Sequence, residues 1–198
     1  MNNNFKTDKR SLKTRDRIKK SVMLLLKNKS DKISVLKITS LAKLSRNTFY
    51  THYSCLVDVY NDIFLDIMEN FDGIFKKYKY EELVNNPYPF IKEIVTVTEL
   101  NSAFSEYVLF SKSPNGMVQK LIDELTDRFY NLYLSSRGDN NRILPYLINF
   151  IIGGVIEIIH KWYKEGKSVD LDNVLESVNQ IIKDSIVMVR DVKKLSVN

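Results

Sequence analysis

The chain of 198 residues has little of several residue types on which catalytic and secreted proteins depend. A single cysteine, Cys55, excludes an intramolecular disulfide framework. There are two histidines, no glycine-rich phosphate loop after a strand, and no pair of carboxylates set apart from ordinary helix surfaces. We therefore predict that the protein is not an enzyme, and we expect no cofactor and no metal site.

Glycine and proline are also scarce, with six and four residues respectively. Long stretches therefore run without the residues that break helices, and no segment alternates polar and apolar residues as a half-buried strand does. Hydrophobic residues make up 44% of the chain, which is enough for a buried core at this length. These features predict an all-α fold.

The sequence pattern shows neither a signal peptide nor a membrane-spanning segment. The basic N-terminus is not followed by the apolar core of a signal peptide. The longest apolar run, around residues 146–159, is interrupted by Asn149 and Glu157, and we expect it to be too short to cross a bilayer. We predict a cytoplasmic protein with no membrane partner.

Acidic residues are scarce in one part of the chain only. From Met1 to Tyr53 there are 14 Lys and Arg against three Asp, a formal charge of +11. Residues 54–198 carry 16 Lys and Arg against 21 Asp and Glu, a formal charge of −5. A basic head on a mildly acidic body is the charge distribution expected of a nucleic-acid-binding protein.

The segment Ser34–Tyr53, with the sequence SVLKITSLAKLSRNTFYTHY, has the spacing of two short helices joined by a tight turn. Apolar residues at positions 35, 38, 41 and 42 fall on one helical face, and Ser45 is a good N-cap for the second helix. We predict a recognition element from Ser45 to Tyr53, in which Phe49 turns toward the core. The residues predicted to contact DNA are Lys37, Ser45, Arg46, Asn47, Thr48, Tyr50, Thr51 and His52.

The hexapeptide Thr48-Phe49-Tyr50-Thr51-His52-Tyr53 resembles the end of the DNA-binding segment in the TetR/AcrR family of bacterial transcription regulators. The resemblance covers about a quarter of the chain, from Thr14 to the start of the helix after Tyr53. It implies an N-terminal three-helix helix-turn-helix domain, joined by a long helix to a C-terminal helical regulatory and dimerisation domain. It also implies a homodimer that binds a palindromic operator in double-stranded DNA and acts as a repressor.

The chain departs from the pattern of this family in two places. The family commonly has Ala and Gly where this chain has Thr39 and Lys43, so we expect strain in the turn if Lys43 takes a positive φ. The family also has Lys near the positions of Ser54 and Leu56, which leaves the usual phosphate clamp without its cations.

Helix-breaking segments and helical periodicity divide the chain further. We predict a flexible basic arm at residues 1–10, a helix-turn-helix DNA-binding domain at residues 11–55, and a helical ligand-binding and dimerisation domain at residues 56–198. Outside the segment described above, the predicted helices run from Ser11 or Thr14 to Lys29, from Cys55 to Tyr80, from Phe90 to Leu100, from Ala103 to Phe110, from Met117 to Leu134, from Ile143 to Lys164, and from Asp172 to about Val192.

The last two predicted helices are apolar around much of their circumference and need neighbours on more than one side. We predict that they pair two subunits through Ile152, Gly153, Ile156, Val178, Ile182 and Ile186. The pair Gly153-Gly154 either lets another helix approach closely or marks a bend, and the sequence leaves both interpretations open.

Control of the protein is predicted to act through the C-terminal domain, with an unknown small-molecule or protein effector. The candidate ligand-binding residues are Phe104, Tyr107, Tyr130, Tyr133, His160 and Trp162, although aromatic residues at helical spacing also suit a simple core. The pattern from Ile159 to Lys167 resembles regulators of dihydroxyacetone kinase operons, which include activators controlled by a partner protein. A transcriptional activator or adaptor of that kind is therefore the alternative to a repressor with a ligand cavity.

Overall fold

The computed structural model describes residues 3–30, 32–110, 116–138 and 142–195, with side chains over 9–30, 32–110, 116–138 and 142–185. These described residues form helices and contain no strand, which confirms the all-α prediction. The chain divides into two compact units, unit 1 with residues 1–70 and 101–107, and unit 2 with residues 71–100 and 108–198. The boundary predicted at residue 56 therefore differs from the division observed, because the first part of the following helix packs within unit 1.

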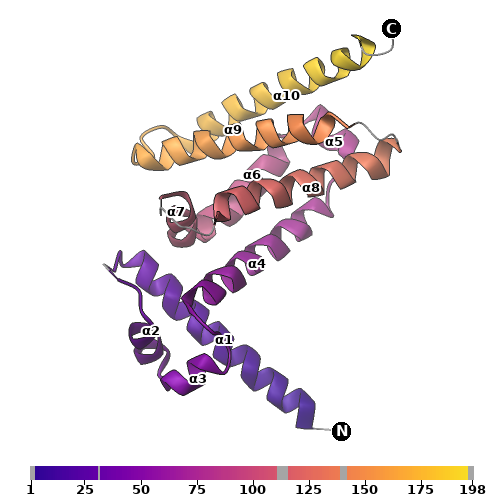
Figure 1. Ribbon diagram of the computed structural model, residues 1–198. Coiled ribbons are helices and arrows are strands. Elements are labelled where there is room, and N and C mark those ends of the chain that lie inside the picture. The colour runs from indigo at the N-terminus through magenta and orange to yellow at the C-terminus, as the bar shows by residue number, and fades with distance from the viewer. Residues whose placement is uncertain (1–2, 31, 111–115, 139–141, 196–198) are drawn as a thin grey trace. The chain divides into compact units, whose positions relative to one another are not determined.

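Unit 1 is built around the N-terminal helices. It contains α1 (Asn3–Lys27), α2 (Val35–Ala42), α3 (Arg46–Tyr50), residues 56–70 of α4 (Leu56–Phe75) and the first part of α7 (Ser102–Phe110). In Figure 1, α2 and α3 lie beside α1. Their shared core consists of apolar side chains with no exposed surface, namely Ile18, Val22, Ile38, Phe49 and Val59. Burial of these side chains is the main force that holds the short helices α2 and α3 in place.

Helix α1 begins at Asn3, whereas the sequence predicted a flexible arm over residues 1–10 and a helix from Ser11 or Thr14. Long polar side chains lose little rotamer freedom in a helix, so a solvated turn can continue a helix without an apolar face. The helix therefore extends on the N-terminal side of Ile18, the first fully buried residue among the side chains described from residue 9 onward in α1.

Unit 2 contains the remaining helices. These are α5 (Tyr80–Asn85), α6 (Tyr88–Leu100), α8 (Met117–Arg137), α9 (Leu144–Lys164) and α10 (Leu171–Leu195), with the ends of α4 and α7. Figure 1 shows α8 beside α9 and α9 beside α10, and α10 also contacts α6. An aromatic cluster of Phe75, Phe90 and Phe129, with ring centroids 4.9 to 5.3 Å apart, joins three helices in its interior.

One predicted helix ends earlier in the structure than expected. The helix expected from Cys55 to Tyr80 ends at Phe75, and α5 then begins at Tyr80. The Glu82 carboxylate accepts a hydrogen bond from the Lys79 N–H at 2.8 Å, which satisfies a backbone donor before the first turn of α5. This interaction stabilises the start of α5, a short helix that the sequence analysis did not predict.

Helix α9 has 21 residues and is long and apolar enough to cross a membrane by length and composition alone. The helix is longer than the apolar run at residues 146–159 on which the prediction rested. Ile152, Trp162 and Tyr163 are buried within unit 2, whereas most of the helix is not buried by the chain itself. Tyr146 and Phe150 on α9 are exposed apolar side chains.

Candidate nucleic-acid interface

The turn between α2 and α3 has the hydrogen bonds of a Schellman cap. The Lys43 N–H donates to the Ser40 carbonyl at 3.1 Å, and the Leu44 N–H donates to the Thr39 carbonyl at 2.9 Å. Lys43 has a φ of 50° and a ψ of 51°, in the left-handed region. The turn therefore requires the conformation that glycine adopts most easily, and the lysine costs about 1 kcal/mol there.

A side chain from α1 supports the same turn. The Arg17 guanidinium donates to the Ala42 carbonyl and, at 3.2 Å, to the Lys43 carbonyl. These carbonyls lie at the end of α2, where backbone acceptors have no partner within the helix. Arg17 therefore fixes the angle at which the chain leaves α2 and enters α3.

The start of α3 is fixed by its own side chains. The Ser45 hydroxyl oxygen accepts a hydrogen bond from the Thr48 N–H at 2.9 Å and lies 2.8 Å from the Thr48 hydroxyl. Ser45 is thus the N-cap that the sequence predicted, and its hydroxyl has a structural partner before any DNA is bound. Thr48 is half-buried, whereas Ser45 remains exposed.

The core anchor of α3 is Phe49, which is fully buried. Its ring meets the Tyr50 ring edge to face at 5.4 Å and lies 5.8 Å from the Tyr53 ring. With Phe49 held inward, the opposite face of α3 is directed to solvent, and Tyr50 is 56% exposed. The other predicted DNA-contact residues that are exposed are Lys37, Arg46, Asn47 and Thr51.

His52 follows α3 and is half-buried. Its Nδ1 atom lies 3.5 Å from the Ser11 hydroxyl oxygen on α1, at the upper limit for a hydrogen bond. Of the two roles that the sequence left open, this contact supports packing against α1 more directly than phosphate binding. It also places the residues around Ser11 next to the end of the recognition element.

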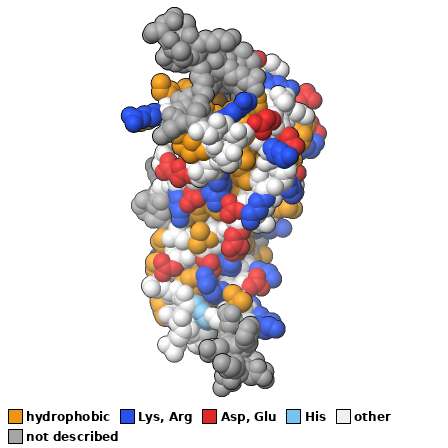
Figure 2. Space-filling view, turned by 90° about the vertical axis from the view of Figure 1, so that its right-hand side faces the viewer, with side chains coloured by type: hydrophobic (Ala, Val, Ile, Leu, Met, Phe, Trp, Pro, Cys, Tyr) orange, Lys and Arg blue, Asp and Glu red, His pale blue; other side chains and the backbone are white. Residues whose placement is uncertain are grey.

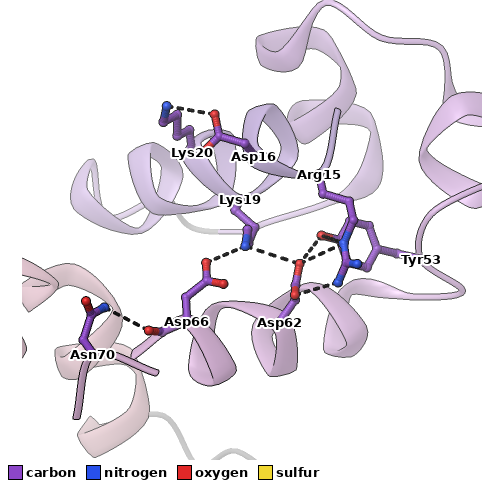
Figure 3. Close-up of polar contacts among 8 residues, drawn as sticks. All are labelled: Arg15, Asp16, Lys19, Lys20, Tyr53, Asp62, Asp66 and Asn70. Atoms are coloured by element: carbon purple, nitrogen blue, oxygen red, sulfur yellow. Dashed lines mark hydrogen bonds and ion pairs between the residues drawn. The ribbon is translucent and has the colours of Figure 1, made fainter. Parts of the chain in front are cut away.

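A polar network that the sequence did not reveal joins α1, the end of the recognition element and α4 (Figure 3). The Arg15 guanidinium donates to the Asp62 carboxylate at 2.7 and 3.3 Å and to the Tyr53 hydroxyl at 3.4 Å. The Tyr53 hydroxyl in turn donates to Asp62. Lys19 pairs with Asp62 at 3.6 Å and also with Asp66. Asp62 therefore connects α1, the end of the recognition element and α4.

Electrostatics within this network favour a charged Asp62. Burial opposes ionisation, but hydrogen bonds from Tyr53 and Arg15 and the charge of Lys19 outweigh it, so the pKa of Asp62 lies below its usual value of 3.8. Burial and the hydrogen bond to Asp62 raise the pKa of Tyr53. At neutral pH, Asp62 is therefore an anion and Tyr53 a neutral hydrogen-bond donor.

The start of α4 lacks the cations of the usual phosphate clamp. The Asp58 carboxylate accepts hydrogen bonds from the Ser54 N–H at 2.8 Å and from the Cys55 N–H at 3.1 Å. A carboxylate thus occupies the backbone donors to which an anion would bind at this helix end. This arrangement agrees with the departure seen at Ser54 and Leu56.

The predicted ligand-binding residues make packing contacts within each of the two units. In unit 1, Phe104 and Tyr107 pack with Tyr60, whose ring centroid is 4.5 Å from that of Tyr107. In unit 2, Tyr130 and Tyr133 lie 6.4 Å apart by their ring centroids. These four residues therefore act at least as core or packing residues.

The two remaining ligand candidates also have partners within unit 2. The His160 ring lies 4.9 Å from the Phe110 ring, and the Trp162 indole N–H donates to the Val169 carbonyl at 2.8 Å. A groove in unit 2 is lined instead by Asn86, Tyr88, Glu176, Ser177, Asn179 and Gln180. Within the described ranges, no group of three or more His, Cys, Asp or Glu side chains is placed to hold a metal ion.

The residues predicted to form the dimer interface differ in how deeply they are buried within the protomer. Ile152 and Val178 are buried in the core of the protomer, so they are not available as surface contacts. Gly153, Ile156 and Ile182 are half-buried, and the side chain of Ile186 lies outside the described residues. Apolar periodicity alone could not tell the face that packs inside unit 2 from the face that looks outward.

The exposed apolar side chains of α9 and α10 form a different set. Tyr146 and Phe150 are each 77% exposed, one helical turn apart on α9, and Ile181 on α10 is 51% exposed. A Cβ atom added at Gly153 or Gly154 would meet no atom within 4 Å. These exposed apolar side chains are not among the residues predicted for the subunit contact, which stays a prediction.

Comparisons with known proteins agree with this architecture. The model of a TetR family described as "Transcriptional regulator C-terminal region" matches residues 85–184. No curated protein matches the sequence. The crystal structure of a TetR transcriptional regulator from Streptococcus agalactiae 2603V is similar in fold, with a TM-score of 0.62 and 22% sequence identity over 91% of this chain and 99% of that chain. Because the family model covers half of the chain, we conclude that this protein belongs to the TetR family of transcriptional regulators.

Proposed function

We propose that this protein is a repressor that binds a palindromic operator in double-stranded DNA as a homodimer, through the outer face of α3. The observation that carries the proposal is the orientation of α3, in which Phe49 is buried while Arg46, Asn47 and Tyr50 are exposed. A buried anchor and an opposite polar face are what a recognition helix needs in order to enter a major groove. In a bacterial cell, this function is exercised in the cytoplasm.

The exposed side chains suit different parts of the DNA. The guanidinium of Arg46 matches the edge of guanine, and the amide of Asn47 matches the edge of adenine. The methyl group of Thr51 suits the methyl group of thymine, whereas Tyr50 and Lys37 suit phosphates. Ser45 and Thr48 contribute chiefly by capping α3, since each already has a partner within the helix.

Dimerisation is part of this mechanism because two recognition helices must reach successive major grooves, about 34 to 36 Å apart. We propose that the outer face defined by Tyr146, Phe150 and Ile181 pairs the two protomers. Large aromatic side chains that are three-quarters exposed are favourable to bury, and each contributes about 1.5 to 3 kcal/mol when it leaves water. A second copy of the same face satisfies both protomers at once.

Control is proposed to act through unit 2, by an effector that remains to be identified. A small molecule would have to open or displace one of the aromatic clusters, for example the stacked Tyr130 and Tyr133. A protein partner needs only an exposed surface. Since the candidate ligand residues already have packing or hydrogen-bond partners within the chain, a partner-controlled activator or adaptor is the second candidate function.

The first experiment selects DNA with the wild-type protein from a pool of random duplexes and then measures the affinity of variants for the selected duplex. Replacement of both Arg46 and Tyr50 by Ala should reduce specific binding to the level of unrelated DNA, with an unchanged circular dichroism spectrum and an unchanged dimer. Arg142→Ala, a change of an exposed arginine in unit 2, is the control and should bind as the wild type does. Equal affinity of the double variant and the wild type would exclude α3 as the recognition helix.

A further inference from the structure

We propose that the groove in unit 2 between α10 and the connection from α5 to α6, here called the amide groove, binds a neutral polyhydroxylated molecule, a sugar or a polyol. The inference goes beyond the proposed function, since it concerns a site in unit 2 alone and its test uses no DNA. Three observations carry it: the position of Asn179 on α10, an unpaired oxygen on that side chain, and the composition of the groove wall.

The amide groove forms where α10 packs against both α5 and α6. Helix α5 ends at Asn85, and Pro87 disfavours a helical conformation of the preceding Asn86, so the chain turns before α6 begins. The volume of the groove is about 560 Å³, within the range of about 300 to 1,000 Å³ of small-molecule sites. Its wall consists of two residues from the turn and four from α10, namely Asn86, Tyr88, Glu176, Ser177, Asn179 and Gln180.

Asn179 lies on the inner side of α10, where its neighbours are apolar. Leu175 is four residues earlier on the same helical face and is 1% exposed, and the adjacent Val178 is fully buried. The Oδ1 atom of Asn179 is buried as well, and it has no hydrogen-bond partner among the described residues. A buried acceptor without a donor destabilises the free protein, so a donor supplied by a ligand has a favourable effect at this position.

The amide of Asn179 can turn toward a ligand at little cost. Its side chain is half-buried and forms part of the groove wall. The torsion about the Cβ–Cγ bond of an asparagine has broad minima, and Oδ1 has no hydrogen bond to break when the amide rotates. A hydroxyl that donates to Oδ1 therefore converts an unpaired acceptor into a paired one.

The groove wall offers donors and acceptors together. The amides of Asn86, Asn179 and Gln180 each carry one acceptor oxygen and two N–H donors. The amide of Gln180 is oriented by a hydrogen bond that it donates to the Asp184 carboxylate at 3.0 Å. A hydroxyl group both donates and accepts, whereas an ammonium group only donates and an ionised phosphate or carboxylate only accepts. A polyhydroxylated molecule therefore complements this wall better than either kind of ion.

The charge around the groove also favours a neutral ligand. Figure 2 shows acidic and basic side chains interspersed over the face that it views, whereas five of the six residues of the groove wall are neutral and the sixth, Glu176, is a carboxylate. Lys92, whose Nζ atom lies 5.7 Å from the centre of the Tyr88 ring, is paired with Asp172 at 2.9 Å. An anion in the groove would thus meet the charge of Glu176, while the nearby lysine already has a partner.

A protein partner would need a different kind of surface. The centre of a protein interface is rich in apolar and aromatic side chains, whereas Tyr88 is the one aromatic residue in the wall of the amide groove. The aromatic ligand candidates Tyr130 and Tyr133 are packed against each other, so a molecule bound there would displace a ring. The amide groove requires no such displacement.

Saturation-transfer NMR on the full chain tests the proposal, with glycerol, sorbitol, glucose and maltose as neutral probes. At least one of them should bind, and glucosamine and glucose phosphate, the charged counterparts of glucose, should bind more weakly than the best neutral probe. Asn179→Leu keeps the branched shape of the side chain and removes the amide. It should weaken binding about tenfold or more, and it should raise the urea midpoint of the free protein because the unpaired oxygen is gone.

Two further variants complete the test. Asn173→Leu makes the same change at an exposed residue of α10 outside the groove wall and should bind the probe as the wild type does. Ser177→Phe, at an exposed position in the wall, fills the groove while the amide of Asn179 is kept, and it should abolish binding. Circular dichroism checks that each variant is folded.

The outcomes separate this inference from the proposed function. No binding by any neutral probe, or equal binding by the wild type, Asn179→Leu and Ser177→Phe, would overturn the amide groove and leave the role of α3 untouched. Stronger binding of glucosamine or glucose phosphate than of every neutral probe would refute the class of ligand. If the wild type selects no DNA sequence, the proposed function fails, but the NMR measurement still decides whether the groove binds.

Discussion

Replacement of Asp62 by Ala removes the carboxylate that connects α1, the recognition element and α4. Four interactions are lost, two with Arg15, one with the Tyr53 hydroxyl and one with Lys19. The Tyr53 side chain is buried, so its hydroxyl is left without an acceptor, which costs about 1 to 3 kcal/mol. Arg15 is 42% exposed and can be hydrated again in the variant. The loss in the free energy of unfolding should therefore stay below the value of about 3 to 5 kcal/mol that is typical when one partner of a fully buried ion pair is removed. We expect a loss of about 2 to 3 kcal/mol.

Urea unfolding of the full chain measures this loss with two signals. Circular dichroism follows helices of both units, whereas fluorescence follows Trp162, the single tryptophan, which lies in unit 2. The variant should begin to lose helical signal at a urea concentration lower by about 1 M or more, since small domains have slopes of about 1 to 3 kcal/mol per M. The urea concentration at the midpoint of the Trp162 fluorescence transition should change less. Asp66→Ala is the control, because Asp66 is 52% exposed and its pair with Lys19 should contribute about 1 kcal/mol or less.

The difference in stability between the wild type and the Asp62→Ala variant should depend on pH. Because the pKa of Asp62 is lower in the folded protein than in the unfolded chain, its charge stabilises the fold above about pH 4, and this contribution is lost as the pH falls through the folded pKa. The difference in stability between wild type and variant should therefore be constant near neutral pH and shrink below pH 3.8, the usual value of this carboxyl. Identical transitions at neutral pH, or a difference that grows in acid, would refute the role assigned to Asp62.

Two further changes test the turn and the subunit contact. Lys43→Gly should raise the free energy of unfolding by about 1 kcal/mol, because glycine adopts the left-handed conformation without strain; a less stable variant would show that the lysine is not strained. Phe150→Glu should yield monomers in sedimentation with an unchanged helical spectrum, since the side chain is 77% exposed in the protomer. Leu100→Glu, a change at a residue of unit 2 that is 79% exposed, should leave the dimer intact, and a dimer that survives Phe150→Glu would place the interface elsewhere.

Much of the helix-turn-helix could be predicted because its determinants are local. Ser45 caps α3 as its position suggested, and the core anchor Phe49 is buried as its spacing required. Lys43 takes a positive φ, the strain expected where the family commonly has glycine. Such features depend on neighbours within a few residues, which a sequence displays directly.

Interactions between distant segments could not be predicted in the same way. Nothing in the spacing of Arg15, Tyr53 and Asp62 indicates that they meet, because their contact depends on how α1 packs against α4. The burial of Ile152 likewise depends on which face of an almost wholly apolar helix turns inward. A helical pattern predicts that such a residue is buried, but the element that buries it is determined by tertiary packing.

The central claim, that α3 reads bases, is tested most directly by parallel selections from random duplexes with the wild type and with Arg46→Ala. The wild type should enrich a two-fold symmetric sequence, and Arg46→Ala should enrich the same sequence with the base preference relaxed at one position in each half-site. That result would identify the base read by Arg46. An unchanged preference at every position, or no enrichment by the wild type, would contradict the claim.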